Sequence, residues 1–242
     1  MNVLQLVKYD LYSIVKSPLT YIALLLTIAP QVLITCLVVN QTHKIDGDML
    51  IGMAIWFFSV TGLLFVIRTI TRDMAQGTLQ LYMNKKKNRL GYTIAKFISI
   101  ILIAILFTVL LTVYVQIVQG LTDGDNVKFN KFVDILWFYI IFFLFYGLLL
   151  YLVAMIVPKP ALIFTLGIFL ILVVPFAEPF LPMIPKFGEK IQHSLKYIPF
   201  SYLTKKTQSS NQTFTHWQWF ITPASIVVLF IVNLFYGAKK DI

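Results

Sequence analysis

The sequence predicts an all-α integral membrane protein with six membrane-spanning helices, and three observations carry this prediction. Of the 242 residues, 59% are hydrophobic and only 12% are charged, whereas a soluble domain carries about 25% charged residues. The apolar residues gather into runs of bilayer length, and a spanning helix needs about 20 of them. None of these runs has a charge at its centre, where a charge costs about 2.5–3.5 kcal/mol.

Residues 2–17 come before the first run, and their pattern is typical of an amphipathic helix that lies in the membrane interface. The apolar residues near one face are Val3, Leu6, Val7, Ile14 and Val15. Lys8, Asp10 and Lys16 fall elsewhere. The candidate functional residues of this interfacial helix are Lys8, Tyr9 and Lys16.

The predicted spans cover residues 19–39, 49–67, 93–118, 135–157, 161–177 and 218–236. Lys96 lies near the start of the third span, and its long side chain can extend to the membrane surface. Residues 158–160 leave almost no loop, so the fourth and fifth spans are predicted to be antiparallel neighbours. We expect Pro175 and the prolines after it to break the fifth helix as it leaves the membrane.

Residues 178–217 form a long segment outside the spans. It keeps many apolar residues and therefore predicts short helices that re-enter the outer interface. The orientation follows from the basic residues, which collect in cytoplasmic loops. If both ends share one side, that side holds twelve of the twenty Lys and Arg residues but three of the ten acids. We therefore expect a multi-pass protein with both termini in the cytoplasm.

The net charge of +10 then reflects topology and affinity for anionic inner-leaflet lipid. It does not indicate nucleic-acid binding, because no basic helix or aromatic platform lies outside the spans. The sequence has no phosphate-binding loop and no nucleophile–base pair, so we expect a non-enzymatic protein. His43, His193 and His216 are scattered and the single cysteine, Cys36, lies in an apolar run, so no metal site is expected.

The loop 68–92 interrupts the apolar pattern with six basic residues. Its first part, 72–83 ("RDMAQGTLQLYM"), predicts a short helix with Asp73 at the N-terminus, where the helix dipole favours an acid. Gly77 costs about 1 kcal/mol inside a helix, which suggests a close approach to another group. Two interpretations stay open: a solvated loop whose lysines only set topology, or a helix on which a cytoplasmic partner docks.

This loop resembles the one between the second and third spans of type-2 ABC (ATP-binding-cassette) transporter permeases. In that family an acid, three residues and Gly-Thr-Leu form a coupling helix that contacts the ATPase. Here the stretch is Asp73 to Tyr82, with Asp in place of the first Glu and Gln80 in place of the second. The coupling residues that the resemblance implies are Arg72, Asp73, Ala75, Gly77, Thr78, Leu79 and Tyr82.

The resemblance also implies partners. Two ATPase subunits would carry the ATP and magnesium, so this chain would bind no cofactor of its own. A second permease, identical or paralogous, would complete the transporter in a bacterial plasma membrane. The first, second and fifth spans would line the translocation path. The candidate residues there are Phe57, Phe58, Phe65, Phe164, Phe169, Phe176 and Glu178.

The small size of the chain resembles the permeases that export peptides, such as phenol-soluble modulins, and those of bacteriocin or lantibiotic immunity systems. The apolar path residues favour an amphipathic or hydrophobic peptide as the cargo. A drug or lipid permease is an alternative within the family. A membrane sensor or assembly protein is the alternative from another class. A secondary transporter is disfavoured, because neither a buried ionisable residue nor an inverted repeat is apparent.

Overall fold

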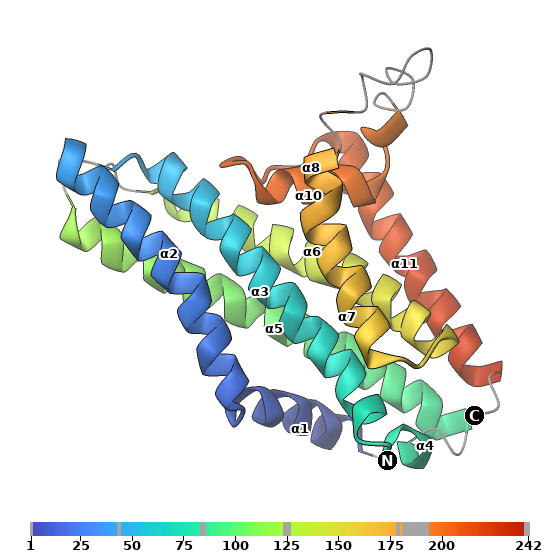
Figure 1. Ribbon diagram of the computed structural model, residues 1–242. Helices are drawn as coiled ribbons and strands as arrows, with labels where there is room; N and C mark the ends of the chain where they lie inside the picture. The colour runs from blue at the N-terminus through green and yellow to red at the C-terminus, as the bar shows by residue number, and fades with distance from the viewer. Residues whose placement is uncertain are drawn as a thin grey trace.

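A computed structural model describes residues 2–42, 45–82, 86–122, 127–177, 180 and 194–239. Within these ranges the secondary structure is helical, and the long helices run alongside one another (Figure 1). The longest are α2 (Pro18–Thr42), α3 (Gly47–Ala75), α5 (Lys86–Leu121), α6 (Phe129–Ile156) and α11 (His216–Lys239). The shorter ones are α1 (Val3–Val15), α4 (Leu79–Tyr82), α7 (Pro160–Ile168), η1 (Phe169–Val173), α8 (Val174–Ala177) and α10 (Pro199–Thr207).

In the part of the chain that the structure describes, five helices are long and apolar enough to cross a membrane: α2, α3, α5, α6 and α11. The protein is therefore a multi-pass membrane protein. The fifth of the six predicted spans corresponds to α7, η1 and α8, which follow one another without a break but are each shorter.

The π-helical turn η1 has a local cause in the sequence. Pro175 follows in α8, and it has no N–H to donate to the carbonyl of Ile171, four residues earlier. The ring also crowds that carbonyl, and a wider turn of Phe169–Val173 accommodates it. The helix therefore continues through Pro175 to Ala177, where the predicted span ends, and the prolines that closely follow lie outside the described residues.

The interior of the bundle is built around α6. Most of α6 is buried, whereas most of α2 and of α11 faces outward. Gly62 lets α3 approach α6 closely, because a Cβ at this position would collide with the ring of Phe143. Asn233 of α11 donates a hydrogen bond to the carbonyl of Leu148 in α6 at 3.0 Å. Small residues and side-chain amides are the usual means by which spanning helices associate.

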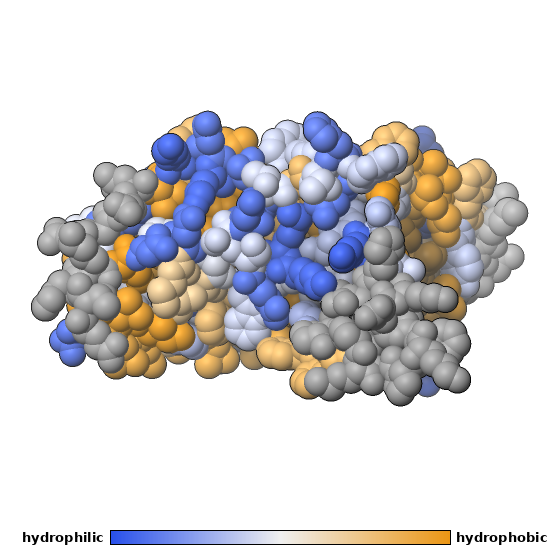
Figure 2. All heavy atoms as spheres, turned by 90° about the horizontal axis from the view of Figure 1, so that it is seen from above, coloured by the Kyte–Doolittle hydropathy of each residue, from blue (hydrophilic) through white to orange (hydrophobic). Residues whose placement is uncertain are grey.

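The two ends of the bundle differ. The termini end carries α1, α4 and both ends of the chain, and α1 lies across it at an angle to α2 (Figure 1). The far end carries α8 and α10. Figure 2 looks down on this far end and shows hydrophilic side chains across it, with hydrophobic ones along the flanks. This distribution suits a molecule whose flanks face lipid.

Only part of the predicted segment 178–217 lies within the described residues. There α10 packs onto the bundle: the Tyr146 hydroxyl donates a hydrogen bond to the carbonyl of Phe200 at 2.8 Å. The hydroxyls of Tyr202 and Thr222 are 2.5 Å apart. Burial raises the pKa of the Tyr202 phenol and lowers the pKa of the Lys206 ammonium group. Glu178 lies outside the described residues.

Candidate functional site

Four charged side chains from three helices meet inside the termini end, and we call them the charge cluster: Asp10 of α1, Arg72 and Asp73 of α3, and Lys96 of α5. All four are buried, with exposures of 1%, 9%, 0% and 2%. Two are cations and two are anions, so the charges balance within the cluster.

The geometry of the charge cluster is a closed set of ion pairs. The Arg72 Nη2 atom lies 2.8 Å from Asp10 Oδ1 and 2.7 Å from Asp73 Oδ1. The Lys96 Nζ atom lies 3.0 Å from Asp10 Oδ1 and 2.9 Å from Asp73 Oδ2. Each cation therefore bridges both carboxylates, and the three helices are held at one point.

Neutral groups complete the shell around these charges. Tyr92 donates its hydroxyl to Asp73 Oδ2 at 2.6 Å, and Ser99 donates to Asp10 Oδ2 at 2.9 Å. Lys96 also donates to the carbonyl of Thr69 at 2.8 Å. Arg72 donates to the Ser13 hydroxyl at 2.8 Å and stacks over the Tyr9 ring at 4.4 Å.

A buried cluster of this kind fixes the position of its helices more than it adds net stability. Desolvating the ions offsets much of their attraction, but removing one partner leaves an unpaired buried charge, at a cost of about 3–5 kcal/mol. The three helices cannot separate at this point without a similar cost. The charge cluster is thus a rigid junction between α1, α3 and α5.

Just beyond the junction, α3 ends at a tight turn. Gly77 has a φ of +68°, a conformation that side chains with a Cβ rarely adopt. The N–H of Thr78 bonds to the carbonyl of Asp73 at 3.0 Å, and the N–H of Gly77 bonds to that of Met74 at 3.2 Å. This pair of bonds is the Schellman motif that closes a helix C-terminus.

The short helix α4 follows this turn and rests on α5. Leu79 is buried, with 9% exposure. The Tyr82 ring stacks on the Tyr92 ring, with centroids 5.8 Å apart and planes 18° apart. Since Tyr92 also bonds to Asp73, contacts run without a gap from α4 through Tyr92 and the charge cluster to α1.

The predicted coupling helix at 72–83 differs from the structure. Arg72, Asp73 and Ala75 belong to the last turn of α3, and a separate helix begins at Leu79. Asp73 does not cap a helix N-terminus but lies in the charge cluster. Among the described residues of this chain, no atom lies within 4 Å of the Cβ position at Gly77, so the close approach is not to another part of the described chain. Gly77 is needed for its positive φ.

The predicted coupling residues divide into two groups. Arg72, Asp73 and Leu79 are buried in the junction, and Tyr82 is half-buried against α5. Ala75 and Gly77 are exposed, together with Gln76, and Thr78 is partly exposed. The exposed group forms a surface at the turn that a partner can reach.

The interfacial-helix residues behave differently from one another. Lys8 and Lys16 are exposed, and the Lys16 ammonium group lies 4.8 Å from the Tyr12 ring. Tyr9 is 47% exposed but supports Arg72. The sequence placed Asp10 away from the apolar face of this helix. That prediction was wrong, because Asp10 is on the buried face with Leu6, Val7 and Ile14.

The position of Lys96 and the presence of buried ionisable residues both differ from what the sequence predicted. Lys96 does not extend to the membrane surface, because its ammonium group is held inside the charge cluster. Buried ionisable residues do occur, although the sequence suggested none. The four in the charge cluster are paired with one another at one end of the bundle, so they do not resemble a single ion-coupling residue in mid-membrane.

The predicted path phenylalanines, all of which the structure describes, lie in different surroundings. Phe58 and Phe65 are buried and both pack edge-on against Phe107 of α5. Phe169 and Phe176 are exposed, at 49% and 61%. Phe164 is half-buried.

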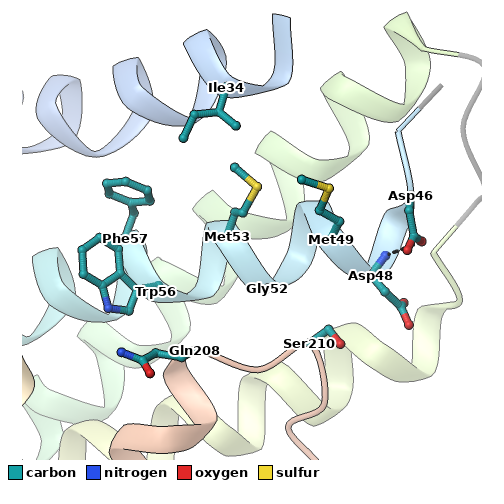
Figure 3. A pocket seen from close by; sticks show the side chains of 10 residues that line it. All are labelled: Ile34, Asp46, Asp48, Met49, Gly52, Met53, Trp56, Phe57, Gln208 and Ser210. Carbon is teal, nitrogen blue, oxygen red and sulfur yellow. Dashed lines mark hydrogen bonds between the residues drawn. The ribbon is translucent and has the colours of Figure 1, made fainter. Parts of the chain in front are cut away.

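Phe57 lines an open pocket of about 570 Å³ near the far end (Figure 3). Its wall on α3 carries Met49, Met53 and Trp56, and Asp46 and Asp48 lie at one rim. Gln208 and Ser210 close the other side. Asp48 is ion-paired with Lys131. The pocket thus combines an aromatic and methionine wall with carboxylates.

Sequence reasoning missed Asp10, Lys96 and Tyr92 as members of the site. The spacing along the helix could have identified Asp10. It is four residues from both Leu6 and Ile14, so it shares their helix face. Across the described ranges, no three His, Cys, Asp or Glu side chains are grouped so that they could hold a metal ion.

Comparison with known proteins places the chain in a family. The sequence model of the family described as "ABC-2 family transporter protein" matches residues 5–237. A search of curated proteins finds no match. Because the family match spans nearly the whole chain and the fold is a multi-pass helical bundle, this protein belongs to the ABC-2 family of transporter permeases.

Proposed function

We propose that this chain is the permease subunit of an ATP-driven exporter and that a separate ATPase subunit drives it through the turn after α3. The observation that carries this proposal is the unbroken series of contacts from α4 through Tyr92 and the charge cluster to α1. A push on α4 or on the turn reaches α3, α5 and α1 together, because the cluster joins them rigidly.

The docking surface in this proposal is the exposed turn of Ala75, Gln76, Gly77 and Thr78. Leu79 and Tyr82 anchor the turn to α5, and Arg72 and Asp73 anchor it to the charge cluster. The ATPase, in two copies, carries the ATP and magnesium. A second permease, identical or paralogous, pairs with this chain, and the helical run α7–η1–α8 serves as a sixth span.

The termini end faces the cytoplasm of a bacterium in this proposal. The basic residues of the loop 68–92 and of the two chain ends support this orientation. The exposed Lys8 and Lys16 of α1 are then placed at the anionic inner leaflet.

The cargo that we propose is an amphipathic or hydrophobic peptide, of the kind that phenol-soluble-modulin exporters carry. The pocket near the far end supports this choice, because its methionine and aromatic wall suits an apolar peptide face. Asp48 at its rim is already paired with Lys131, so Asp46 is the rim carboxylate that suits a basic side chain. Bacteriocin or lantibiotic immunity would use a similar cargo in the same direction.

Co-purification from the native membrane tests the proposal. Mass spectrometry of material bound to the full-length protein should identify an ATPase subunit, and Ala75→Arg should abolish its recovery. Gln208→Arg, an exposed change at the far end, is the matched control and should retain the subunit. A folded wild-type protein without any ATPase would instead favour a sensor or assembly role.

A further inference from the structure

A second cavity lies among the spanning helices, away from the charge cluster. It is a groove of about 720 Å³ between α2, α3 and α5. Its walls are mainly aliphatic and include Val32, Val113 and Ile117, and the fully buried Phe58 forms part of its floor. Ligand pockets in proteins have volumes of about 300–1,000 Å³ and such apolar walls.

The lining of the groove indicates what can occupy it. Its aliphatic walls offer hydrocarbon contacts over most of its length and few polar partners, which suits a thin extended hydrocarbon chain.

Two polar residues of the groove, Asn40 and Thr122, lie at one end of it. Asn40 is the last residue of the span Pro18–Asn40, and Thr122 directly follows the span Lys87–Leu121. This end of the groove is therefore level with the far-end membrane interface. Deeper in, the Thr35 and Tyr114 hydroxyls lie 3.2 Å apart and bond to each other, so the rest of the groove offers mainly hydrocarbon.

We infer that this groove binds one acyl chain of a membrane phospholipid. The chain lies between α2 and α5, and its ester end is at the interface beside Asn40, whose amide N–H is a suitable donor to an ester carbonyl. Apolar walls below and a polar mouth at the interface match the polarity of a phospholipid along its length. α2 packs mainly on α3 and has few contacts with α5, so the groove between α2 and α5 is open at the flank of the bundle.

Native mass spectrometry of the full-length protein in detergent, with added palmitoyl-oleoyl phosphatidylglycerol, tests this inference. The wild type should retain one phospholipid per chain, with saturation. Val113→Trp and Cys36→Trp fill the groove from its two opposite walls, so each should weaken retention about tenfold or more, equivalent to about 1.4 kcal/mol. Val228→Trp on α11 also adds a Trp to an exposed spanning position and should leave retention unchanged.

The single cysteine gives a second readout in the unmodified protein. Cys36 is exposed and lines the groove, so bound phospholipid should slow its alkylation by N-ethylmaleimide, and the effect should saturate. Equal phospholipid retention in all four proteins would overturn the inference. A wild-type protein that retains a peptide, or that forms a dimer without lipid, would also overturn it. An alkylation rate that phospholipid does not change would do the same.

Discussion

Lys96 shows how one side chain can hold several helices in place. Its ammonium group contacts Asp10 of α1, Asp73 of α3 and the carbonyl of Thr69. In an apolar run such a lysine normally extends toward water. Here two carboxylates from other helices compensate the charge, so it stays inside.

Replacing Lys96 tests whether the charge cluster holds the three helices together. Lys96→Met should lower the free energy of unfolding by about 3–5 kcal/mol, because it leaves one negative charge unpaired in the interior. Thermal unfolding of the purified protein in detergent measures this. Lys159→Met, an exposed change, is the control and should have little effect.

The double variant Lys96→Met with Asp10→Leu separates charge balance from simple packing. It restores a neutral cluster and should recover part of the lost stability. If it is as unstable as the sum of the two single variants, the paired charges do not form the junction described here.

The charge cluster also shows where sequence reasoning ends. Each member was visible as a charge, but Lys96 and Asp10 are 86 positions apart. Nothing in one sequence pairs residues so distant. The helix face of Asp10 could be read from its spacing, whereas its partners depend on how α1 folds back across the bundle.

Among the helices, the hydrophobic pattern located the spanning ones because each has to present an apolar surface to lipid. It was less informative about their ends. The helix α3 continues to Ala75, beyond the predicted span that ended at residue 67, because the charge cluster buries its last, polar turn. The hydrogen-bonded turn at Gly77 then ends the helix.

Gly77 provides a prediction about this turn. Gly77→Ala should destabilise the protein by about 1–2 kcal/mol, since a residue with a Cβ is strained at positive φ. It should also weaken ATP-dependent transport, because the turn belongs to the proposed docking surface. Thermal unfolding and a vesicle transport assay measure the two effects.

The control for Gly77 is Gly120, which lies in the last turns of α5 and has no atom of the described residues within 4 Å of its Cβ position. Gly120→Ala should be neutral or slightly stabilising, because alanine favours a helix. Similar losses for the two substitutions would contradict a special role for the conformation of Gly77.

The contact between α3 and α6 gives another prediction. Gly62→Ala should destabilise the protein, because the new methyl group overlaps the Phe143 ring and overpacking costs about 1–3 kcal/mol. Gly52→Ala on the same helix is the matched control, since its Cβ would lie 3.5 Å from Ser210 in ordinary contact. Equal unfolding temperatures for the two variants would show that α3 and α6 are not closely packed.

For the protein as a whole, the apolar flanks and the family match identify a multi-pass ABC-2 permease. The composition alone indicated the membrane, and the Gly-Thr-Leu stretch indicated the family. The basic residues predicted that α1 and the loop after α3 lie on the side of the termini. How these elements contact one another could not be predicted, because the contacts include ion pairs between helices that are distant in sequence.

Site-specific photo-crosslinking shows whether an ATPase contacts the turn after α3. A photoreactive residue at Gln76, exposed in the turn, should form a covalent product with an ATPase subunit in native membranes. The same residue at Gln208, exposed at the far end, should not. Crosslinking to an ATPase from Gln208, or from neither position in a folded protein, would contradict this account.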